Sequence, residues 1–507
     1  MVTEVASGMV QGVEGEIVNV QADISDGLPI FYMIGYLSNE VREAKDRVRT
    51  ALKNSGFLLP AKRISVNFAP ADFRKNGTYF DLAVAVALLI AMGLVSKQEA
   101  EGVIFLGELS LDGKLSPVSG VLPIVSKGVK KGYDRCIVPK GNEKEAAFIE
   151  KMEVFSFSTL QEVFCYLIGE SDVEPEKPPM IKEEGRQARQ LDFSDVRGQN
   201  MAKRAIEIAA AGFHNLFLDG PPGVGKSMLA ACMPGIMPDM TREEMIETTM
   251  IYSVKGLLRE DFSLVQKRPF RAPSHAVTQA GMFGGGRNPK PGEASLAHHG
   301  ILFLDELPEF SREMIEMFRI PMERHSINMI RNEKSLIFPA DFLLVAAANP
   351  CPCGYYPDLE KCHCKSWQID RYQSKISGPI LDRLDLFVRC DEVSYDVLSK
   401  EKEKRHSEHI RKKIEEVWNL QKERFQKEKL LFNSRMEHKD LEKHCALDGD
   451  GNRLMKAAFQ SFALTGRSYF KILKISRTIA DLEGCMQIRP RHLEEALQFR
   501  NIRFKNG

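Results

Sequence analysis

The sequence predicts an α/β fold, because three apolar runs with the length of buried strands each end in polar residues. These runs are Leu216–Leu218, Gly300–Leu304 and Leu343–Ala348. Continuous apolar runs of this length are typical of strands that are covered on both faces. The first run leads through a glycine-rich loop into a helical pattern that begins near Met228. We therefore expect a parallel sheet with its polar groups at the carboxyl ends of the strands.

The loop after the first strand carries the most specific motif of the chain. It reads Gly220-Pro221-Pro222-Gly223-Val224-Gly225-Lys226-Ser227. In such a loop, glycines let backbone N–H groups close around phosphate oxygens, the lysine reaches the β and γ phosphates, and the hydroxyl binds Mg²⁺. We expect these eight residues to bind ATP with Mg²⁺, and the chain to hydrolyse a nucleoside triphosphate.

Polar residues at the ends of the other two strands extend this predicted site. Asp305 and Glu306 directly follow the second strand, and Asn349 follows the third. We expect Asp305 to hold Mg²⁺ through water, Glu306 to deprotonate the attacking water, and Asn349 to fix that water beside the γ-phosphate. A helix start at Asp305 and a turn at Asn349 before Pro350 are the ordinary alternatives.

An arginine further along the chain completes the predicted chemistry. Arg383 lies in the run Ser377–Asp385 and is our candidate for a cation that a neighbouring subunit delivers to the transferring phosphoryl group. A hydrolysis site that needs an arginine from a neighbour implies a ring.

The composition of the chain limits the number of domains and the kinds of partner that we expect. The chain has 507 residues, of which 43% are hydrophobic and 27% are charged, so we expect two or three packed domains. Its formal net charge is +1, so contact with nucleic acid would depend on local basic patches. The start lacks the pattern of a secretory signal, and the longest apolar run, Leu82–Val95, is too short to span a bilayer. We expect a cytoplasmic protein that is not in a membrane.

The chain divides by pattern into four segments. Residues 1–170 alternate strand-like and helix-like patterns, such as the period-two run Gly15–Ala22, and predict an α/β domain. Residues 171–190 have the proline and charge content of a linker. Residues 191–395 hold the nucleotide site, and residues 396–507 read as helices.

Longer runs around these motifs resemble those of one family. They are Pro269–His275 through Arg287, Gly300–Phe310, and Asn349–Gly354 through Leu386. With the glycine-rich loop, they resemble the ComM/YifB group of magnesium-chelatase-like AAA+ proteins. The resemblance implies a P-loop AAA+ domain with a helical lid. It also implies that Arg467 in the lid reports the nucleotide state, with Arg477 as second choice and a solvated surface arginine as the alternative for either.

Residues 1–170 resemble the ribosomal-S5-type domain that this group shares with Lon, notably at Gly107–Lys114 and Ile137–Asn142. The position of Lon's nucleophilic serine holds Tyr79, and that of its lysine holds Leu122. Neither side chain supports serine–lysine acyl transfer. We therefore do not expect peptidase activity.

Four cysteines lie within fourteen positions, as Cys351-Pro352-Cys353 and Cys362-His363-Cys364. In a reduced compartment, this spacing favours a structural Zn²⁺ held by the four thiolates, with His363 as a substitute ligand. Unligated surface cysteines are the alternative. The loop connects Asn349 to Arg383, so that a metal there would brace two parts of the site.

A β-hairpin with a charged tip is the predicted contact with a substrate. Strand-like runs at Ser326–Ile330 and Ser335–Phe338 flank Arg331-Asn332-Glu333-Lys334. In related ring ATPases this hairpin points into the pore, where Arg331 and Lys334 would grip phosphates. An ordinary solvated turn is the alternative. A second candidate contact combines Lys267–Arg271 with Gly284–Arg287.

The resemblance implies a hexameric DNA helicase that promotes branch migration during recombination or natural transformation. Two other functions remain open. One is a chelatase-like ATPase that remodels a protein partner, and the other is a nucleotide-controlled binding module with negligible turnover. Glu306 and Arg383 argue against the last of these.

Overall fold

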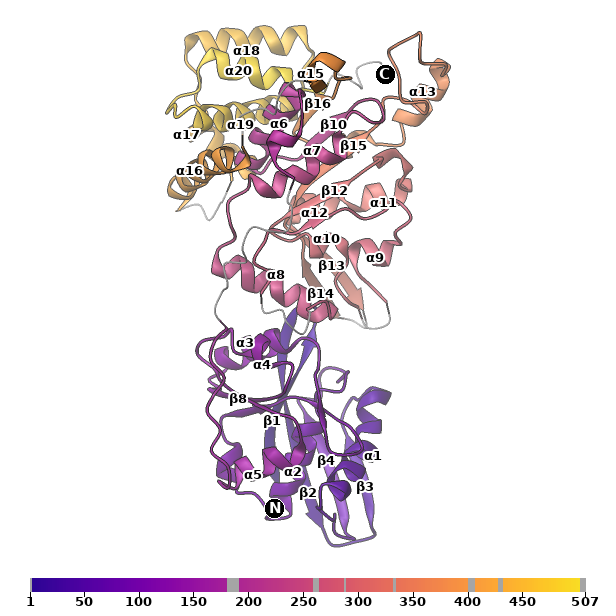
Figure 1. Cartoon of the computed structure of the whole chain (residues 1–507), viewed down its shortest axis with the longest axis vertical. Coiled ribbons are helices and arrows are strands. Elements are labelled where there is room, and N and C mark those ends of the chain that lie inside the picture. The colour runs from indigo at the N-terminus through magenta and orange to yellow at the C-terminus, as the bar shows by residue number, and fades with distance from the viewer. Residues whose placement is uncertain are drawn as a thin grey trace.

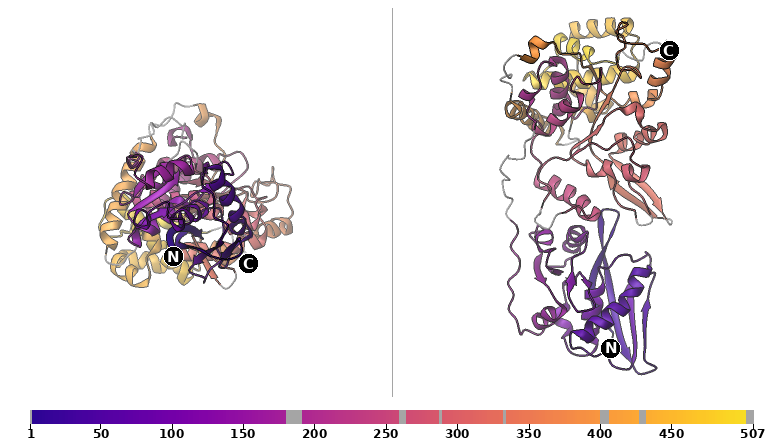
Figure 2. Two further views of the ribbon diagram at one scale, coloured as in Figure 1. Left: turned by 90° about the horizontal axis from the view of Figure 1, so that it is seen from below. Right: turned by 45° about the vertical axis from the view of Figure 1, so that its right-hand side comes forward.

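The computed structural model of the chain describes residues 2–179, 191–258, 264–286, 289–331, 334–399, 406–426 and 432–501. The molecule is elongated, with an N-terminal α/β part at one end and C-terminal helices at the other (Figure 1). A central part with the second sheet lies between them, and the same order is visible from a second direction (Figure 2).

The N-terminal part is built on a mixed sheet in the order β3-β4-β2-β1-β5-β8-β9. Its strands are β1 (Thr3–Gln11), β2 (Glu14–Ser25), β3 (Ile30–Ile34), β4 (Arg63–Ala69), β5 (Val103–Phe105), β8 (Arg135–Pro139) and β9 (Glu153–Phe157). β1 and β2 pair antiparallel around a tight turn at Gly12 and Val13, whereas β5, β8 and β9 run parallel. The period-two run at Gly15–Ala22 lies within β2, as predicted.

Helices form two apolar cores against this sheet. α1 (Asn39–Asn54), α2 (Asp81–Ala91) and α5 (Leu160–Leu167) share one core, and α3 (Val121–Lys130) and α4 (Glu143–Ala146) share the other. Most of the longest apolar run of the sequence forms α2, which is buried from Asp81 to Ile90 and is therefore a core helix. None of the described helices is both long enough and apolar enough to cross a membrane.

The second sheet is parallel, in the order β11-β12-β15-β10-β16. Its strands are β10 (Leu216–Asp219), β11 (Phe270–Arg271), β12 (Ile301–Leu304), β15 (Leu343–Ala348) and β16 (Leu386–Arg389). β10, β12 and β15 are the three strands that the apolar runs predict. The carboxyl ends of all three meet at one edge, because parallel strands end together.

Short helices and a hairpin surround this sheet. The helices are α6 (Asn200–Gly212), α7 (Lys226–Cys232), α8 (Arg242–Lys255), α9 (Gln279–Phe283), α10 (Glu293–Leu296), α11 (Arg312–Met317), α12 (Arg319–Arg324), α13 (Ser366–Gln373) and α14 (Gly378–Leu381). The predicted hairpin is observed as β13 (Ser326–Arg331) paired with β14 (Lys334–Pro339).

The C-terminal segment is helical, as predicted. It contains α15 (Tyr395–Ser399), α16 (Ser407–Phe425), α17 (His438–His444), α18 (Gly449–Ser461), α19 (Gly466–Leu482) and α20 (Pro490–Gln498). α16 and α19 pack on α6, and the ring of Phe213 stacks on Phe432 with centroids 4.6 Å apart. The lid and the second sheet therefore share one apolar core.

Helix α8 joins the N-terminal part to the second sheet (Figure 1). Leu122 of α3 and Phe148 are buried in an apolar cluster with Met245, Ile246 and Met250 of α8. At the centre of this contact, the carboxylate of Glu145 accepts hydrogen bonds from the N–H of Leu122, at 2.9 Å, and from the hydroxyl of Ser253. Both parts of the molecule thus satisfy one buried carboxylate.

The turn between β1 and β2 makes a second contact between these parts. The side chain of Val13 packs against the apolar core beneath the β13–β14 hairpin, which also contains Met329 and Leu336. A methyl group added at Gly12 would lie 3.5 Å from the carbonyl oxygen of Ile337. The N-terminal part therefore touches the hairpin itself.

Candidate functional site

The phosphate loop joins the end of β10 to the start of α7. Gly223 and Gly225 have φ angles of 80° and 91°, a conformation that glycine adopts without steric cost. The ammonium group of Lys226 is buried and donates hydrogen bonds to the carbonyl oxygens of Gly220, at 2.7 Å, and Pro221, at 2.8 Å. Burial lowers the pKa of Lys226, and the nearby carboxylates oppose that shift. The lysine is thus held across the loop, where it can meet a phosphate.

The two acidic residues after β12 face this loop. Ser227 Oγ donates a hydrogen bond to Asp305 Oδ2 at 2.7 Å, which joins the two predicted Mg²⁺ ligands. Glu306 is exposed, and its φ of 50° is uncommon for a residue with a side chain. Such a conformation often marks a functional turn. Hydroxyl and carboxylate oxygens are suitable ligands for Mg²⁺.

Asn349 at the end of β15 completes the group. Its Oδ1 accepts a hydrogen bond from Lys226 Nζ at 3.1 Å. The structure therefore brings together Lys226, Ser227, Asp305 and Asn349 from three neighbouring strands. Glu306 lies with Ser227 and Asp305 around a cavity of about 330 Å³.

The same cavity is lined by residues for which the sequence predicted no role in the nucleotide site, although Phe270 belongs to the second candidate substrate contact. They are Phe270, Ala272, Pro273, Ser274, His275 and Phe303. Ser274 and His275 are exposed and follow the edge strand β11, which places polar side chains opposite the phosphate loop. Most of these residues belong to the Pro269–His275 run, which carries part of the family resemblance. The pairing of β11 in this run with β12 could not be predicted from local patterns, because it joins Phe270 to Ile301, which are far apart in the sequence.

The two candidate arginines lie away from this cavity. Arg383 follows α14 and donates hydrogen bonds to the carbonyl oxygen of Pro379, at 2.6 Å, and to Glu323. Its Nε is buried and has no partner among the described residues. Arg467, at the start of α19, is exposed and donates to Asp382 at 3.2 Å. Arg467 thus contacts Asp382, the residue that precedes Arg383, and neither arginine lines the cavity of its own chain.

Arg477, the second choice for a lid sensor, is buried and tied to the lid itself. It donates to Asp481 Oδ1 at 3.0 Å and to the carbonyl oxygens of Met486 and Cys485. Asp481 also receives the guanidinium of Arg424. This network stabilises the lid. The burial of Arg477 shows that it is not a solvated surface arginine, and its role as a sensor stays a prediction.

Comparison with known proteins agrees with this geometry. Residues 192–398 match the model of magnesium chelatase subunit ChlI, and residues 404–500 match that of the ChlI C-terminal region. A further ChlI model matches residues 20–142. The chain is 40% identical to the competence protein ComM of Haemophilus influenzae over 497 residues, which cover 96% of this chain and 95% of ComM. It is 39% identical to YifB of Salmonella typhimurium over 493 residues, which cover 97% and 95% of the two chains.

The chain belongs to the ComM/YifB family of magnesium-chelatase-like AAA+ proteins. Membership supports ATPase activity, with ATP and Mg²⁺ as the ligands of the site. The phosphate loop, Asp305 and Glu306 are the residues of this chain that fit such ligands.

A partial match extends to the archaeal Lon protease of Pyrococcus abyssi, with 29% identity over 182 residues, or 35% of this chain and 18% of that protease. In this ComM/YifB member, Tyr79 lines an interdomain cavity and Leu122 is fully buried against α8. Burial raises the pKa of Tyr79 to about 12. The two positions that would carry a serine and a lysine in Lon thus hold a neutral phenol and a packing residue.

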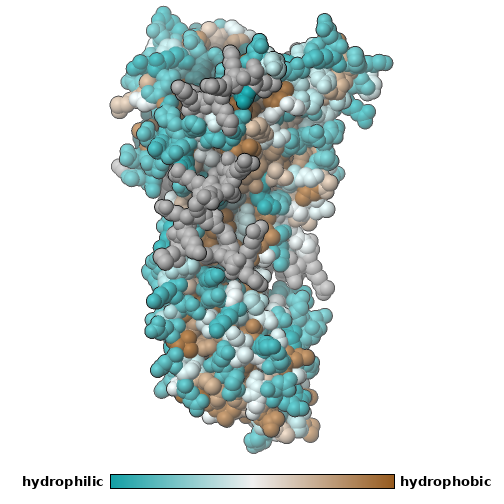
Figure 3. Space-filling model, viewed as in Figure 1, coloured by the Kyte–Doolittle hydropathy of each residue, from teal (hydrophilic) through white to brown (hydrophobic). Residues whose placement is uncertain are grey.

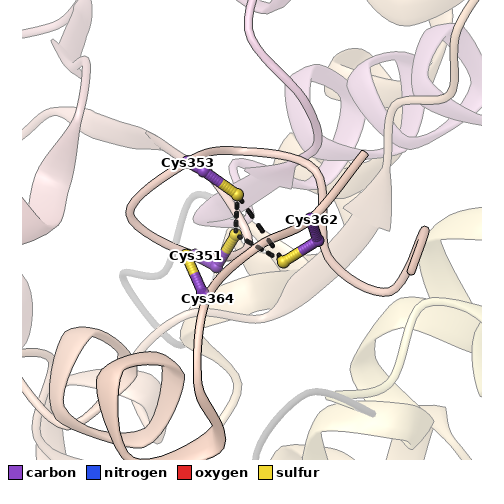
Figure 4. Close-up of side chains that lie close together, drawn as sticks. All are labelled: Cys351, Cys353, Cys362 and Cys364. Carbon is purple, nitrogen blue, oxygen red and sulfur yellow. Dashed lines mark hydrogen bonds between the residues drawn. The ribbon is translucent and has the colours of Figure 1, made fainter. Parts of the chain in front are cut away.

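The four clustered cysteines face one another between β15 and α13 (Figure 4). Cys351 Sγ lies 3.3 Å from Cys353 Sγ and 3.7 Å from Cys362 Sγ, and all four sulfur atoms lie within 4.8 Å of one another. Four thiolates at 2.3 Å from a tetrahedral Zn²⁺ would be about 3.8 Å apart. The Tyr356 N–H donates to Cys351 Sγ at 3.4 Å, as is common around metal-bound sulfur. The donor set fits Zn²⁺.

The cysteine loop also touches the phosphate loop. Gly354 has a φ of 90°, and a methyl group there would lie 2.5 Å from Pro222 Cδ. Only glycine fits such a close approach. Gln373 Nε2 of α13 donates to the carbonyl oxygen of Pro350 at 3.0 Å. The loop is therefore in contact with both the phosphate loop and the strand end that carries Asn349.

Two parts of the predicted substrate contact lie outside what the structure describes. They are the side chains of Arg331 and Lys334 at the hairpin tip, with Asn332 and Glu333 between them, and Arg287 in the glycine-rich segment. The hairpin strands themselves are described, and Ile330 and Ile337 expose 80% and 57% of their surface on it. Ile330 and Ile337 thus form an exposed apolar pair on the hairpin.

Proposed function

We propose that the chain is an ATP-hydrolysing ring motor that acts on DNA as a helicase or translocase and promotes branch migration in recombination. The observation that carries the ATPase part is the joint placement of Lys226, Asp305, Glu306 and Asn349 at one sheet edge. The DNA part is supported by the 40% identity to a protein named for competence.

In this proposal, the chain's own residues bind and orient the nucleotide. The phosphate loop would hold the phosphates, Ser227 and Asp305 would hold Mg²⁺, and Glu306 would take a proton from the attacking water. Asn349 would orient that water, since its amide lies beside the lysine that reaches the γ-phosphate. Mg²⁺ would neutralise charge on the transferring phosphoryl group.

The ring is supported by the position of the two arginines. Arg467 contacts Asp382, the residue before Arg383, and both arginines lie away from the cavity of their own chain. A guanidinium that is remote from its own site acts on ATP only when a neighbour presents its site to it. We propose a homo-oligomer, with six subunits as the expected number, in which Arg383 completes the next subunit's site and Arg467 reports its nucleotide state.

DNA would pass the β13–β14 hairpins. Arg331 and Lys334 stand at the ends of the two strands, where a cationic tip would contact the phosphate backbone without reading the sequence. The chain's net charge of +1 gives no general attraction for DNA, so these tips would supply a local one.

Zinc would hold the cysteine loop. We propose one structural Zn²⁺ on Cys351, Cys353, Cys362 and Cys364, which would fix the position of Gly354 against the phosphate loop. The ion would act structurally, because four thiolates leave no open coordination position.

The decisive experiment is steady-state ATP hydrolysis by the full chain with no DNA and with single-stranded, double-stranded and branched DNA. We expect stimulation by DNA and displacement of a strand from a branched substrate. Both should be lost in Lys226→Ala, whereas Arg331→Ala with Lys334→Ala should weaken both the stimulation and the strand displacement and leave basal hydrolysis unchanged. Basal hydrolysis without binding of any DNA at low salt would refute the DNA part and favour the chelatase-like alternative, in which a protein partner is remodelled.

A further inference from the structure

The edge strand β3 exposes an unbroken row of apolar side chains. Ile30, Tyr32 and Ile34 expose 42%, 44% and 50% of their surface, and Leu28 and Tyr36, which continue the row at each end, expose 84% and 53%. The alternate residues Phe31 and Met33 pack against the core. The segment 28–36 contains no charged residue. Natural edge strands are usually protected by charges, prolines or a covering element. Here Pro29 precedes the strand, but Ile30–Ile34 itself contains neither a proline nor a charge, so the strand proper is open to a partner.

The backbone of β3 is also open, at the edge that faces away from β4. Among the described residues, β3 pairs with β4 alone and stands at the end of the sheet order. The opposite edge of the sheet is closed, because Glu176 N donates to Val154 O of β9 at 2.7 Å and Ser156 Oγ donates to Glu176 Oε1 at 2.5 Å. Head-to-tail extension of the sheet from one molecule to the next is therefore blocked, and β3 is the edge that is left for pairing.

The sequence of β3 is complementary to itself. An antiparallel pair of two copies centred on Tyr32 sets Tyr32 opposite Tyr32 on the outer face and Ile30 opposite Ile34 on both sides of it. On the inner face it sets Phe31 opposite Met33. Each cross-strand pair is aromatic or aliphatic, and none brings like charges together. A strand with this symmetry fits a two-fold contact, which uses the same surface on both molecules.

We propose that β3 is a dimerisation strand, on which the β3 of a second copy of this chain docks antiparallel across a two-fold axis. The two N-terminal sheets would then form one continuous sheet, and the two apolar rows would pack against each other as cross-strand pairs on its outer face. This surface lies on the N-terminal part, at the end of the molecule remote from the lid, where brown hydrophobic residues interrupt the hydrophilic surface (Figure 3). The contact is separate from the nucleotide site and would join two chains whether or not an ATP-dependent ring forms.

Cysteine crosslinking of the full chain tests the register. In Tyr32→Cys the two introduced thiols would face each other at cross-strand distance, within disulfide reach. The matched control is Ser65→Cys, which lies directly beside Tyr32 on β4. Two copies of that residue would be three strand spacings, or about 14 Å, apart. We expect a disulfide-linked dimer of Tyr32→Cys under mild oxidation and none from Ser65→Cys or the unaltered chain.

Light scattering on nucleotide-free full chain tests the dimer itself. We expect the unaltered chain to have the mass of a dimer at micromolar concentration, and Tyr32→Lys with Ile34→Lys to weaken self-association by about 100-fold or more, because the register sets like charges near each other. Unchanged circular dichroism and ATP hydrolysis in the double variant would show that it is folded. A monomeric unaltered chain, a double variant that still dimerises, or loss of dimer without a Tyr32→Cys disulfide would overturn the proposal. None of these results depends on DNA, so the proposal can fail while the proposed function stands.

Discussion

The ammonium group of Lys226 and the amide oxygen of Asn349 are 3.1 Å apart, although 123 residues separate them. This hydrogen bond connects the phosphate loop to the end of β15. It places the group that we expect to reach the γ-phosphate next to the group that we expect to orient water. Predictions for catalysis follow from this pair and from the carboxylates beside it.

Replacing Asn349 with alanine should slow hydrolysis by about 10- to 100-fold and leave ATP binding nearly unchanged, since one positioning donor is lost. Lys226→Ala should lose both hydrolysis and ATP binding, because the ammonium group that we expect to bind the phosphates is removed. Steady-state hydrolysis and the affinity for a fluorescent ATP analogue separate these two effects. Ser374→Ala, at the end of α13 and outside the cavity, is the control. Full turnover by the Asn349→Ala chain would show that Asn349 does not take part in hydrolysis.

Glu306→Gln should bind ATP and hydrolyse it about 100-fold more slowly or worse, because glutamine does not accept a proton from water. The exposed position of Glu306 means that the substitution should leave stability within about 0.5 kcal/mol of the unaltered chain. Single-turnover hydrolysis and thermal unfolding check both statements. Hydrolysis at the normal rate would assign the proton transfer elsewhere.

Arg383 should act between subunits. Because Glu323 holds Arg383 in the single chain, Glu323→Gln should free the guanidinium and raise hydrolysis or leave it unchanged, whereas Arg383→Ala should abolish it. Mixing Arg383→Ala chains with Lys226→Ala chains should restore some activity, since a mixed boundary then has one intact site. Mixtures with no more activity than the two separate samples would argue against an arginine supplied by a neighbour.

The cysteine cluster should hold about one Zn²⁺ per chain. Elemental analysis of protein purified without chelator or metal-binding tag checks the amount. Cys353→Ser should lose the metal and lower thermal stability, whereas Cys165→Ser, far from the cluster in α5, should change neither. Since Gly354 contacts Pro222, loss of the ion should also weaken ATP binding. Metal-free protein with unaltered nucleotide affinity would show that the cluster does not affect ATP binding by the phosphate loop.

Glu145 should make the domain contact sensitive to pH. Burial raises the pKa of Glu145, so the folded chain binds this proton more tightly than the unfolded chain. The free energy of unfolding therefore falls as the pH rises from the ordinary glutamate pKa of 4.5 towards the raised value. Glu145→Gln keeps an acceptor for Leu122 N and lacks this titration. Its melting temperature should exceed that of the unaltered chain more at about pH 8 than at about pH 5. The exposed Glu153→Gln should show no such trend, and a constant difference across this range would contradict the assignment.

Local patterns predicted the nucleotide-binding part well. The phosphate loop, Asp305 and Asn349 each follow a strand-like apolar run, and such runs also define which residues meet at one sheet edge. The β13–β14 hairpin and the cysteine group depend on short-range spacing in the same way. Each of these features is complete within a few residues of sequence.

Contacts between distant segments were not predictable in this way. Ser274 and His275 join the cavity through a two-residue strand that has no periodicity. Arg477 lies in a helix whose mixed composition is typical of a surface helix. Its burial depends on Asp481 together with Arg424 from another helix. The burial of Leu122 required α8, more than 100 residues away. In each case the partner, and not the local pattern, decides the environment.

The contact of Val13 with the hairpin core has a mechanical consequence. If nucleotide turnover tilts the hairpin, the β1–β2 turn must tilt with it or slide out of an apolar pocket. In the proposed motor, a movement of the hairpin would therefore be passed to the N-terminal sheet through Val13.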